Sequence, residues 1–354
     1  MPLEEPRWWY RDDGHRRPLI GLAGQAVGML AVRRMRQVPR WRAPVPVICI
    51  GNFTAGGTGK TPLALLVAAM LAAAGERPAF LTRGYGGRSG RTRMVDRSLD
   101  TARDVGDEAL MLAGRAPTCV SADRVAGARL LCERDDPPTV IVMDDGLQNP
   151  ALAKDLTIAV VDGVRGIGNA RVLPAGPLRA PIEAQLALVS AIVVNGRGED
   201  GRDVASGGEG DIATKLRGRF PGPVLSVAAE PSEPLDWLRS GSWIAFAGIG
   251  NPQRFFDMLR RHGGDVVHTF AFSDHHAFSE RDAAELLDTA QSVQAGLVTT
   301  EKDQVRLIGS PGRCGELADK VRSVPIRLTL GDEHRRRLEG LLEGTLSARR
   351  RQSP

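Results

Sequence analysis

Short runs of Val, Ile and other apolar residues alternate with helical patterns along most of the chain. In the first half this alternation predicts β-strands at 45–50, 78–82, 139–143, 157–161 and 191–194. Between them, apolar residues at helical spacing predict helices at 62–74, 107–112 and 124–133. Strands that alternate with helices favour a mostly parallel, doubly wound sheet with helices on both faces. An α/β architecture is therefore predicted.

A second α/β set follows in the sequence. Its predicted strands lie at 224–228, 244–249, 266–272, 297–300 and 326–330, and its helices near 252–262, 280–292 and 333–346. The stretch 171–181 carries three prolines and Gly176, which favours a crossing between two domains. We therefore divide the chain into an N-terminal segment, two α/β domains and a C-terminal helix with a frayed basic tail, at 1–42, 43–175, 176–330 and 331–354.

Composition narrows the function classes. The 354 residues are 42% hydrophobic and 25% charged, which is ordinary for a globular protein of two domains. The four cysteines are scattered without a C-x-x-C pair, so they indicate thiols in a reducing cytosol rather than a zinc site or disulfide framework. The net charge of +5 is modest and comes from arginines near both ends. No nucleic-acid reader motif accompanies them, so nucleic acid is not an expected partner. The glycine-rich stretch 197–218 is predicted to be a solvated loop.

The segment 51–61, Gly-Asn-Phe-Thr-Ala-Gly-Gly-Thr-Gly-Lys-Thr, links a predicted strand to a predicted helix. Glycine backbone lets successive N–H groups point at phosphate oxygens, and the helix N-terminus adds positive potential. The strict phosphate-loop pattern has glycine where this chain has Thr54, so the match is to a variant G-G-x-G-K-T. The alternative is a flexible glycine loop with an incidental lysine. The residues expected to bind nucleotide phosphate are Thr54, Ala55, Gly56, Gly57, Thr58, Gly59, Lys60 and Thr61, with Thr61 also a ligand of Mg²⁺.

Two carboxylates, Asp144 and Asp145, end the predicted buried strand 139–143. An aspartate at that place in phosphate-loop proteins holds the Mg²⁺ that bridges the β- and γ-phosphates. The alternative is a pair of solvated turn aspartates, which strand ends also favour.

Three further segments carry weaker signals. Asp107 begins a helix after a polar stretch and is either an N-cap or a base that orients an acceptor hydroxyl. His275 and His276 are adjacent, so they do not share a helix face and do not indicate a two-histidine metal site. Two interpretations remain: one of them acts in proton transfer, or both lie in a polar surface loop. Arg83 and Tyr85 lie in a glycine-rich turn after a strand and are candidates for contacting phosphate or a nucleobase.

The N-terminal segment combines Trp8, Trp9 and Tyr10 with several arginines around an apolar stretch, Leu19 to Val32. That stretch is about 14 residues, short of the roughly 20 that cross a bilayer. A small-residue cleavage site does not follow it, so a secretory signal is not predicted. Aromatic residues and arginines around an apolar helix suit a helix that lies in the membrane interface. The alternative is an amphipathic helix packed on the domain.

Taken in order, eight segments between Trp8 and about Leu307 resemble the tetraacyldisaccharide 4'-kinase, or lipid A 4'-kinase, family. They are G-N-F-T-A-G-G-T-G-K-T-P at 51–62, R-G-Y-G at 83–86, G-D-E at 106–108, D-D-G-L-Q at 144–148, L-P-A-G-P-L-R at 173–179, F-A-G-I-G-N-P at 246–252, D-H-H at 274–276 and T-E-K-D at 300–303.

The resemblance implies two α/β/α domains joined by a hinge, the first like a phosphate-loop NTPase. It also implies an ATP- and Mg²⁺-dependent kinase, peripheral or monotopic on the cytoplasmic face of the inner membrane. The acceptor would be the 4'-hydroxyl of an acylated glucosamine disaccharide 1-phosphate. The enzyme would contact the membrane surface through its N-terminal segment. No obligate protein partner is expected.

The resemblance also implies residue roles. Lys60 binds phosphate and takes part in catalysis, Asp144 and Asp145 serve the metal, Asp107 is the catalytic base and His275 its partner. Tyr85 lines the nucleotide site, and the candidates for contacting substrate are Arg83, Asn149 and Arg179.

Two positions depart from the family pattern. Asn149 stands where a histidine is frequent, and Ala180 where many members have glutamate, so any contact of those side chains is in question. A switch or partitioning ATPase that acts on a protein partner, and a cytosolic kinase for a soluble sugar, are the rival hypotheses. The first predicts partner-stimulated hydrolysis without a lipid acceptor. The second has no need of the aromatic and basic N-terminus.

Overall fold

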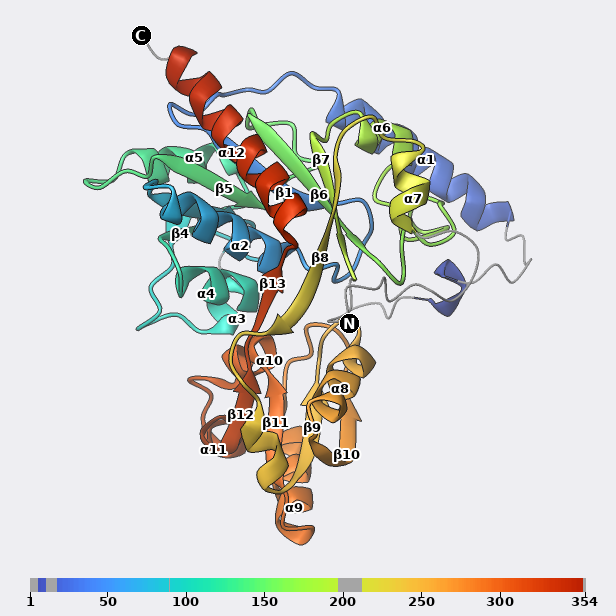
Figure 1. Cartoon of the computed structure of the whole chain (residues 1–354), viewed down its shortest axis with the longest axis vertical. Coiled ribbons are helices and arrows are strands. Elements are labelled where there is room, and N and C mark those ends of the chain that lie inside the picture. Colours follow the sequence, from blue (N-terminus) through green and yellow to red (C-terminus); the bar gives the residue numbers. More distant parts are fainter. Residues whose placement is uncertain (1–5, 11–17, 89, 197–211, 353–354) are drawn as a thin grey trace.

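The computed structural model describes residues 6–10, 18–88, 90–196 and 212–352 (Figure 1). They form a large lobe and a small lobe. We define the small lobe as residues 236–324 and the large lobe as the other described residues. Figure 1 shows the small lobe below the large one, with β8 (Val224–Pro231) and β13 (Ile326–Thr329) running between them.

Within the described ranges, nine strands form the sheet of the large lobe, in the order β13-β8-β7-β6-β1-β5-β2-β4-β3. Their pairing is parallel except at the two edges, where β13 and β3 run antiparallel to β8 and β4. The remaining strands are β1 (Val47–Asn52), β2 (Pro78–Thr82), β3 (Arg93–Met94), β4 (Thr118–Val120), β5 (Val140–Asp144), β6 (Leu156–Asp162) and β7 (Ala191–Asn195). Every residue of β1, β5, β6 and β7 is buried, which explains their near-continuous apolar sequences.

Helices cover both faces of this sheet. Apolar side chains of α2 and α12 pack on one face, and those of α5, α6 and α7 on the other. The helical segments of the large lobe are η1 (Arg7–Trp9), α1 (Pro18–Met35), α2 (Lys60–Ala73), α3 (Ala102–Val105), α4 (Asp107–Ala113), α5 (Arg124–Cys132), α6 (Ile182–Leu186), α7 (Ile212–Arg217) and α12 (Asp332–Gln352). The predicted doubly wound, mostly parallel sheet is confirmed.

The small lobe, which lies within the uninterrupted range 212–352, has a four-stranded parallel sheet in the order β10-β9-β11-β12. Its strands are β9 (Ser242–Ala247), β10 (Asp265–Ala271), β11 (Gly296–Thr300) and β12 (Val321–Val324). Its helices are η2 (Asp236–Ser240), α8 (Pro252–Arg261), α9 (Glu280–Ser292), α10 (Glu301–Leu307) and α11 (Gly312–Lys320). Separate apolar clusters lie on the two faces of this sheet, so both lobes are three-layered.

The boundaries between the two lobes differ from the expected domain boundary between 175 and 176. Strands β7, β8 and β13 fall in the expected second domain, 176–330, yet all three belong to the sheet of the large lobe. The chain crosses between the lobes at 231–236 and 324–326, not at 171–181. Local alternation identifies a strand, but its neighbours in a sheet are chosen by long-range packing that a pattern does not contain.

Two further expectations need correction. Helix α12 continues to Gln352, and Nη2 of Arg349 donates to the backbone oxygen of Ala43 over 2.5 Å, so residues 349–352 are not a frayed tail. Residues 197–211 of the predicted glycine loop lie outside the described residues. Its end, Ile212–Arg217, is helix α7, which buries Ala213 and Leu216.

Candidate active site

The glycine-rich segment leaves β1 and enters α2 at Lys60, as the sequence predicts. Gly56 and Gly59 have φ values of 91° and 95°, the left-handed region that favours glycine. A Cβ on Gly59 would also lie 2.4 Å from Nδ2 of Asn195. Thr54 is not among the positive-φ residues, and its backbone oxygen accepts a hydrogen bond from Nε of Arg179 over 3.0 Å. The backbone at position 54 therefore does not require the glycine that the strict phosphate-loop pattern has there.

The sheet brings Asp144 beside this loop. Strands β1 and β5 are parallel neighbours with Ile50 opposite Asp144, so their carboxyl ends meet at one edge. The hydroxyl of Thr61 donates to Oδ2 of Asp144 over 3.3 Å, and Nζ of Lys60 lies 3.9 Å from Oδ1 of Asp145. Asp144 is buried and Asp145 is ion-paired with Lys60 and Arg179, which contradicts the alternative of two solvated turn aspartates.

The two carboxyls have different electrostatic surroundings. Burial raises the pKa of Asp144 to about 7, with further contributions from the charges of Glu108 and Asp145. Burial also acts on Asp145, but Lys60 and Arg179 outweigh it and lower its pKa. Nη1 of Arg179 donates to Oδ1 of Asp145 over 2.7 Å. Asp145 is thus an ion-pair partner, whereas Asp144 is a buried carboxyl for which the described residues supply no ion pair of its own.

The surroundings of Asp144 fit a hard divalent cation. Its Oδ1 is buried without a hydrogen-bond partner among the described residues, although an unpaired buried polar atom is costly. The described residues contain no group of three or more His, Cys, Asp or Glu that would enclose a metal. Mg²⁺ does not need one, because it is usually bound by one or two protein oxygens together with waters and phosphate. A carboxylate beside the hydroxyl of Thr61 is such a donor set.

The lobes meet at Asp107 and His275. Asp107 is the first residue of α4, with Gly106 as the N-cap, so the N-cap alternative for Asp107 does not hold. Nδ1 of His275, from the segment after β10, lies 3.2 Å from Oδ2 of Asp107. The ring of Tyr85 meets the ring of His275 edge-on at 5.1 Å. The structure therefore brings together a carboxylate, an imidazole and a phenol that are far apart in the sequence.

Sequence reasoning missed two partners of this pair, both on α10. Arg306 donates from Nε to Oδ2 of Asp107 over 2.6 Å, and also contacts Asp303 and the backbone of Gly248. Nζ of Lys302 lies 3.2 Å from Nε2 of His275. Burial raises the pKa of Asp107, but Lys302, His275 and Arg306 outweigh it and hold this pKa well below its usual range. The T-E-K-D segment was a signal for Lys302, whereas nothing in the sequence singled out Arg306.

The remaining predicted residues lie at the edge of this region. Arg83 and Tyr85 are exposed, and Arg179 joins the phosphate loop to Asp145. Oδ1 of Asn149 accepts the backbone N–H of Ala151 over 2.9 Å, so this side chain supports a turn. Ala180 is buried, and its backbone oxygen accepts a hydrogen bond from Gln185.

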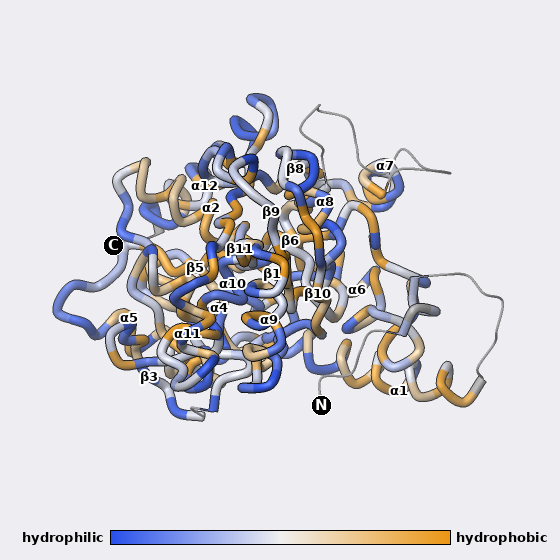
Figure 2. Tube along the Cα trace, turned by 90° about the horizontal axis from the view of Figure 1, so that it is seen from below, coloured by the Kyte–Doolittle hydropathy of each residue, from blue (hydrophilic) through white to orange (hydrophobic). Residues whose placement is uncertain are grey.

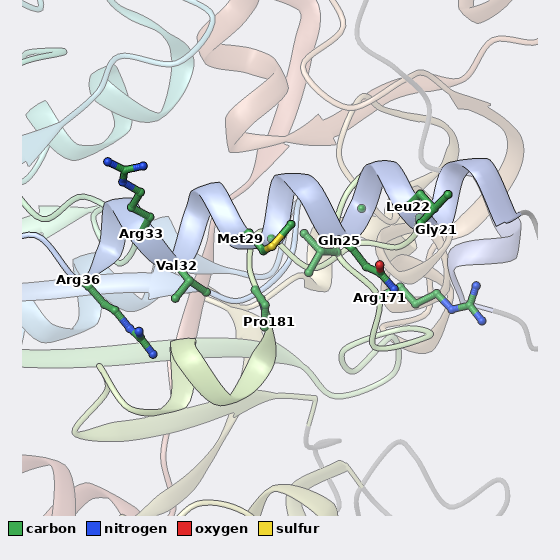
Figure 3. A pocket seen from close by; sticks show the side chains of 13 residues that line it. Gly21, Leu22, Gln25, Met29, Val32, Arg33, Arg36, Arg171 and Pro181 are labelled. Atoms are coloured by element: carbon green, nitrogen blue, oxygen red, sulfur yellow. The ribbon is translucent and has the colours of Figure 1, made fainter.

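A pocket of about 1210 Å³ lies along α1, next to the segment 171–181 (Figure 3). Figure 3 shows Met29 and Val32 on the side of α1 that faces Pro181, with Arg36 and Arg171 toward the two ends. Close packing of α1 on this segment depends on Gly24, where a Cβ would lie 2.8 Å from the backbone oxygen of Val172. The same segment carries Arg179 to the phosphate loop, so it connects the pocket to the phosphate-loop region.

Figure 2 shows α1 at one edge of the molecule, with many apolar residues along it. Leu19, Leu22, Met29 and Leu30 are 80%, 61%, 69% and 68% exposed. Large apolar side chains gathered on one exposed surface are characteristic of interaction sites. Among the described residues, no helix has both the length and the apolar character needed to cross a bilayer.

Comparison with known proteins decides the family. Residues 17–343 match the family described as tetraacyldisaccharide-1-P 4'-kinase. The chain belongs to this family. Its relatives include the tetraacyldisaccharide 4'-kinases of Bradyrhizobium sp. (strain ORS 278), 44% identical over 94% of this chain and 95% of that protein, and of Parvibaculum lavamentivorans, 43% identical over 93% and 95%. The family members are phosphotransferases that act on a lipid disaccharide, so a switch or partitioning ATPase is not favoured.

A solved structure shares the fold. The crystal structure described as the "apo" form of LpxK from Aquifex aeolicus in complex with ATP matches with a TM-score of 0.68, covering 93% of this chain and 98% of that one. The two sequences are 24% identical. This likeness confirms the predicted combination of a phosphate-loop kinase fold with a second α/β lobe.

Proposed function

We propose that this chain is the ATP- and Mg²⁺-dependent kinase that transfers a γ-phosphoryl group to the 4'-hydroxyl of tetraacyldisaccharide 1-phosphate. Beyond family membership, the observation that carries the proposal is the contact between Thr61 and Asp144, together with a buried Asp144 oxygen that has no hydrogen-bond partner in the described part of the chain. A lone glycine loop does not require a carboxylate at that place, whereas a nucleotide site with Mg²⁺ does.

On this proposal, the donor binds to the loop 54–61. Backbone N–H groups and the N-terminus of α2 cradle the phosphates, and Lys60 neutralises their charge. Thr61 and Asp144 would hold Mg²⁺, which supplies charge neutralisation across the β- and γ-phosphates. Asp145, paired with Lys60 and Arg179, keeps these two cations in position rather than binding the metal itself.

We propose that the acceptor hydroxyl binds at Asp107. Oδ2 of this carboxylate is occupied by His275 and Arg306, whereas Oδ1 accepts the backbone N–H of Glu108 and has a second lone pair. We assign Oδ1 as the atom that orients the 4'-hydroxyl and takes its proton. The lowered pKa of Asp107 makes it a weak base, which suits phosphoryl transfer because positioning and charge neutralisation contribute more than covalent chemistry.

We propose that the acyl chains and the membrane surface contact α1. The exposed apolar side chains of α1 would enter the lipid interface, and Arg33, Arg36 and Arg171 around the pocket suit an anionic headgroup. The segment 171–181 then links the lipid side to the phosphate loop through Arg179. We therefore propose a peripheral or monotopic enzyme, on the cytoplasmic face of the inner membrane.

The test is transfer of labelled γ-phosphate from ATP to tetraacyldisaccharide 1-phosphate in mixed micelles. The wild type is compared with Lys60→Ala, with a reaction without acceptor and with one without Mg²⁺. Labelled lipid that requires Lys60 and Mg²⁺ supports the proposal. Phosphate release without labelled lipid contradicts it, as does near-normal turnover of a folded Lys60→Ala variant.

A further inference from the structure

The imidazole of His275 is held between a carboxylate and an ammonium group. Its Nδ1 lies 3.2 Å from Oδ2 of Asp107, and its Nε2 lies 3.2 Å from Nζ of Lys302. Both neighbours come from helices, α4 in the large lobe and α10 in the small lobe. Oδ2 of Asp274 also faces Nε2, but at 3.9 Å it is beyond hydrogen-bond distance. Within hydrogen-bond distance, each ring nitrogen therefore has a partner of opposite hydrogen-bonding character.

Lys302 is held in its charged form. Its Nζ lies 3.3 Å from Oε1 of Glu108 and 3.6 Å from Oδ1 of Asp274. Burial lowers the pKa of Lys302, but the charges of Glu108, Asp107 and Asp274 outweigh it and raise this pKa above its ordinary value. An ammonium group has three donors and no acceptor, so a hydrogen bond with Lys302 requires a lone pair on the other atom.

The position of the ring is fixed by the backbone. His275 has a φ of 57°, in the left-handed region, and its N–H donates to the backbone oxygen of Gly248 and to Oδ1 of Asp274. Lys302 lies on α10 one turn before Arg306, which binds Asp107. A single face of α10 thus contacts both members of the Asp107–His275 pair.

We propose that Lys302 is a positioning residue that fixes the tautomer of His275. Because Nε2 must accept from Lys302, the single proton of the neutral ring is on Nδ1, where it is donated to Oδ2 of Asp107. That donation holds the carboxylate so that Oδ1 remains available for the acceptor hydroxyl. The catalytic consequence rests on the proposed kinase function, whereas the tautomer assignment does not depend on it.

A merely structural role makes a different prediction. If Lys302 only joins the lobes through its ion pair with Glu108, then removing either charge weakens the same contact. Both losses would lower the melting temperature, and neither would change the tautomer of His275. Glu108→Gln is therefore the matched control, because it removes the ion pair but leaves the donor to Nε2 in place.

The experiment is long-range ¹H–¹⁵N spectroscopy on the full chain labelled with ¹⁵N-histidine. His275→Gln identifies the signals of His275 among the six histidines. We expect the Nδ1–H tautomer in the wild type, in Glu108→Gln and in Lys302→Arg, which keeps an N–H donor. Lys302→Met should show the Nε2–H tautomer or exchange between the two. The Nε2–H tautomer in the wild type overturns the proposal, whether or not any variant folds.

Kinetics supply the second readout, with folding of each variant checked by thermal melting. Lys302→Met should lower kcat by about tenfold to a hundredfold, by analogy with the loss of the second hydrogen-bond partner of a metal-bound histidine. KM for the lipid should change little, and Lys302→Arg should recover part of the loss. An unchanged tautomer in folded Lys302→Met, or a changed tautomer with normal kcat, rejects the positioning role. Absence of transfer by the wild type would reject the kinase function and leave the tautomer measurement intact.

Discussion

Arg306 donates from Nε to Oδ2 of Asp107 over 2.6 Å, and the two side chains are only 6% and 4% exposed. The contact joins α10 of the small lobe to α4 of the large lobe. The same guanidinium binds Asp303 and the backbone oxygen of Gly248, so its position is fixed from its own lobe. The candidate catalytic carboxylate therefore has its charge stabilised by a residue of the opposite lobe.

Arg306→Met should shift the pH dependence of activity. The pKa of Asp107 is depressed with Arg306 present, so loss of this cation raises that pKa and moves the acid limb of kcat/KM to higher pH. The measurement is kcat/KM against pH for the wild type, Arg306→Met and Arg306→Lys, which retains the charge. An acid limb at the same pH in all three would show that Arg306 does not control Asp107.

The same ion pair has a consequence for stability. Because the folded-state pKa of Asp107 is depressed, its contribution is present above the unfolded-state pKa of about 3.9 and is lost as pH falls below it. Removing one partner of a buried pair costs about 3–5 kcal/mol. Arg306→Met should therefore lower the free energy of unfolding at neutral pH by that order, measured by denaturant titration.

Asp107→Asn should lower turnover by roughly a hundredfold or more, because general-base contributions typically have that size. The amide keeps the shape of the side chain but cannot take the proton of the acceptor hydroxyl. The measurement is kcat in the labelled-ATP assay, beside the binding of ATP. Normal kcat with a lower melting temperature would show that the role of Asp107 is structural and not catalytic.

Asp144→Asn and Asp145→Asn should have opposite effects on stability without Mg²⁺. Burial disfavours the charge of Asp144, so Asp144→Asn should raise the melting temperature near pH 8. Asp145 is ion-paired with Arg179 and Lys60, so Asp145→Asn should lower it. Addition of Mg²⁺ with ATP should stabilise the wild type more than Asp144→Asn. Equal stabilisation of the wild type and Asp144→Asn would contradict the assignment of Asp144 as a metal ligand.

Replacing Leu22, Met29 and Leu30 together by Ser should weaken binding to vesicles that contain anionic lipid. All three are large, apolar and exposed on α1, so the change removes the surface that would enter the interface. Leu99→Ser is the matched control, because Leu99 is 78% exposed and lies outside α1. The measurement is sedimentation with vesicles. Binding equal to that of the wild type would reject the membrane role of α1.

Local elements were largely predictable from the sequence. The central strands and the loop at 51–61 have strong local signals, because a fully buried strand needs a continuous apolar run and a phosphate loop needs glycine at defined positions. Asp144 was found for the same reason, since it ends a continuous apolar run. The pairing of that strand with β1 was seen only in the structure. The roles of these residues in catalysis stay predictions.

Long-range relationships were less accessible. The membership of β7, β8 and β13 in the first sheet depends on pairing between segments far apart in the chain. Arg306 approaches Asp107 only because the lobes meet. In the sequence, a buried arginine within a helix has no feature that distinguishes it from a solvent-exposed arginine. His275 was placed beside Asp107 by resemblance to a family rather than by its local sequence.

The paired strands β8 and β13 have a consequence for how the molecule moves. Everything between Pro231 and Ile326 is an insertion into the large lobe, and its two ends leave from adjacent, antiparallel strands with Leu328 opposite Ala229. A two-stranded ribbon bends readily across its plane, whereas sliding one strand along the other breaks its ladder of hydrogen bonds. We therefore expect the enzyme to open by a rotation of the small lobe relative to the large lobe about essentially one axis. The distance between the acceptor-side carboxylate and its histidine would report directly on the angle of that rotation.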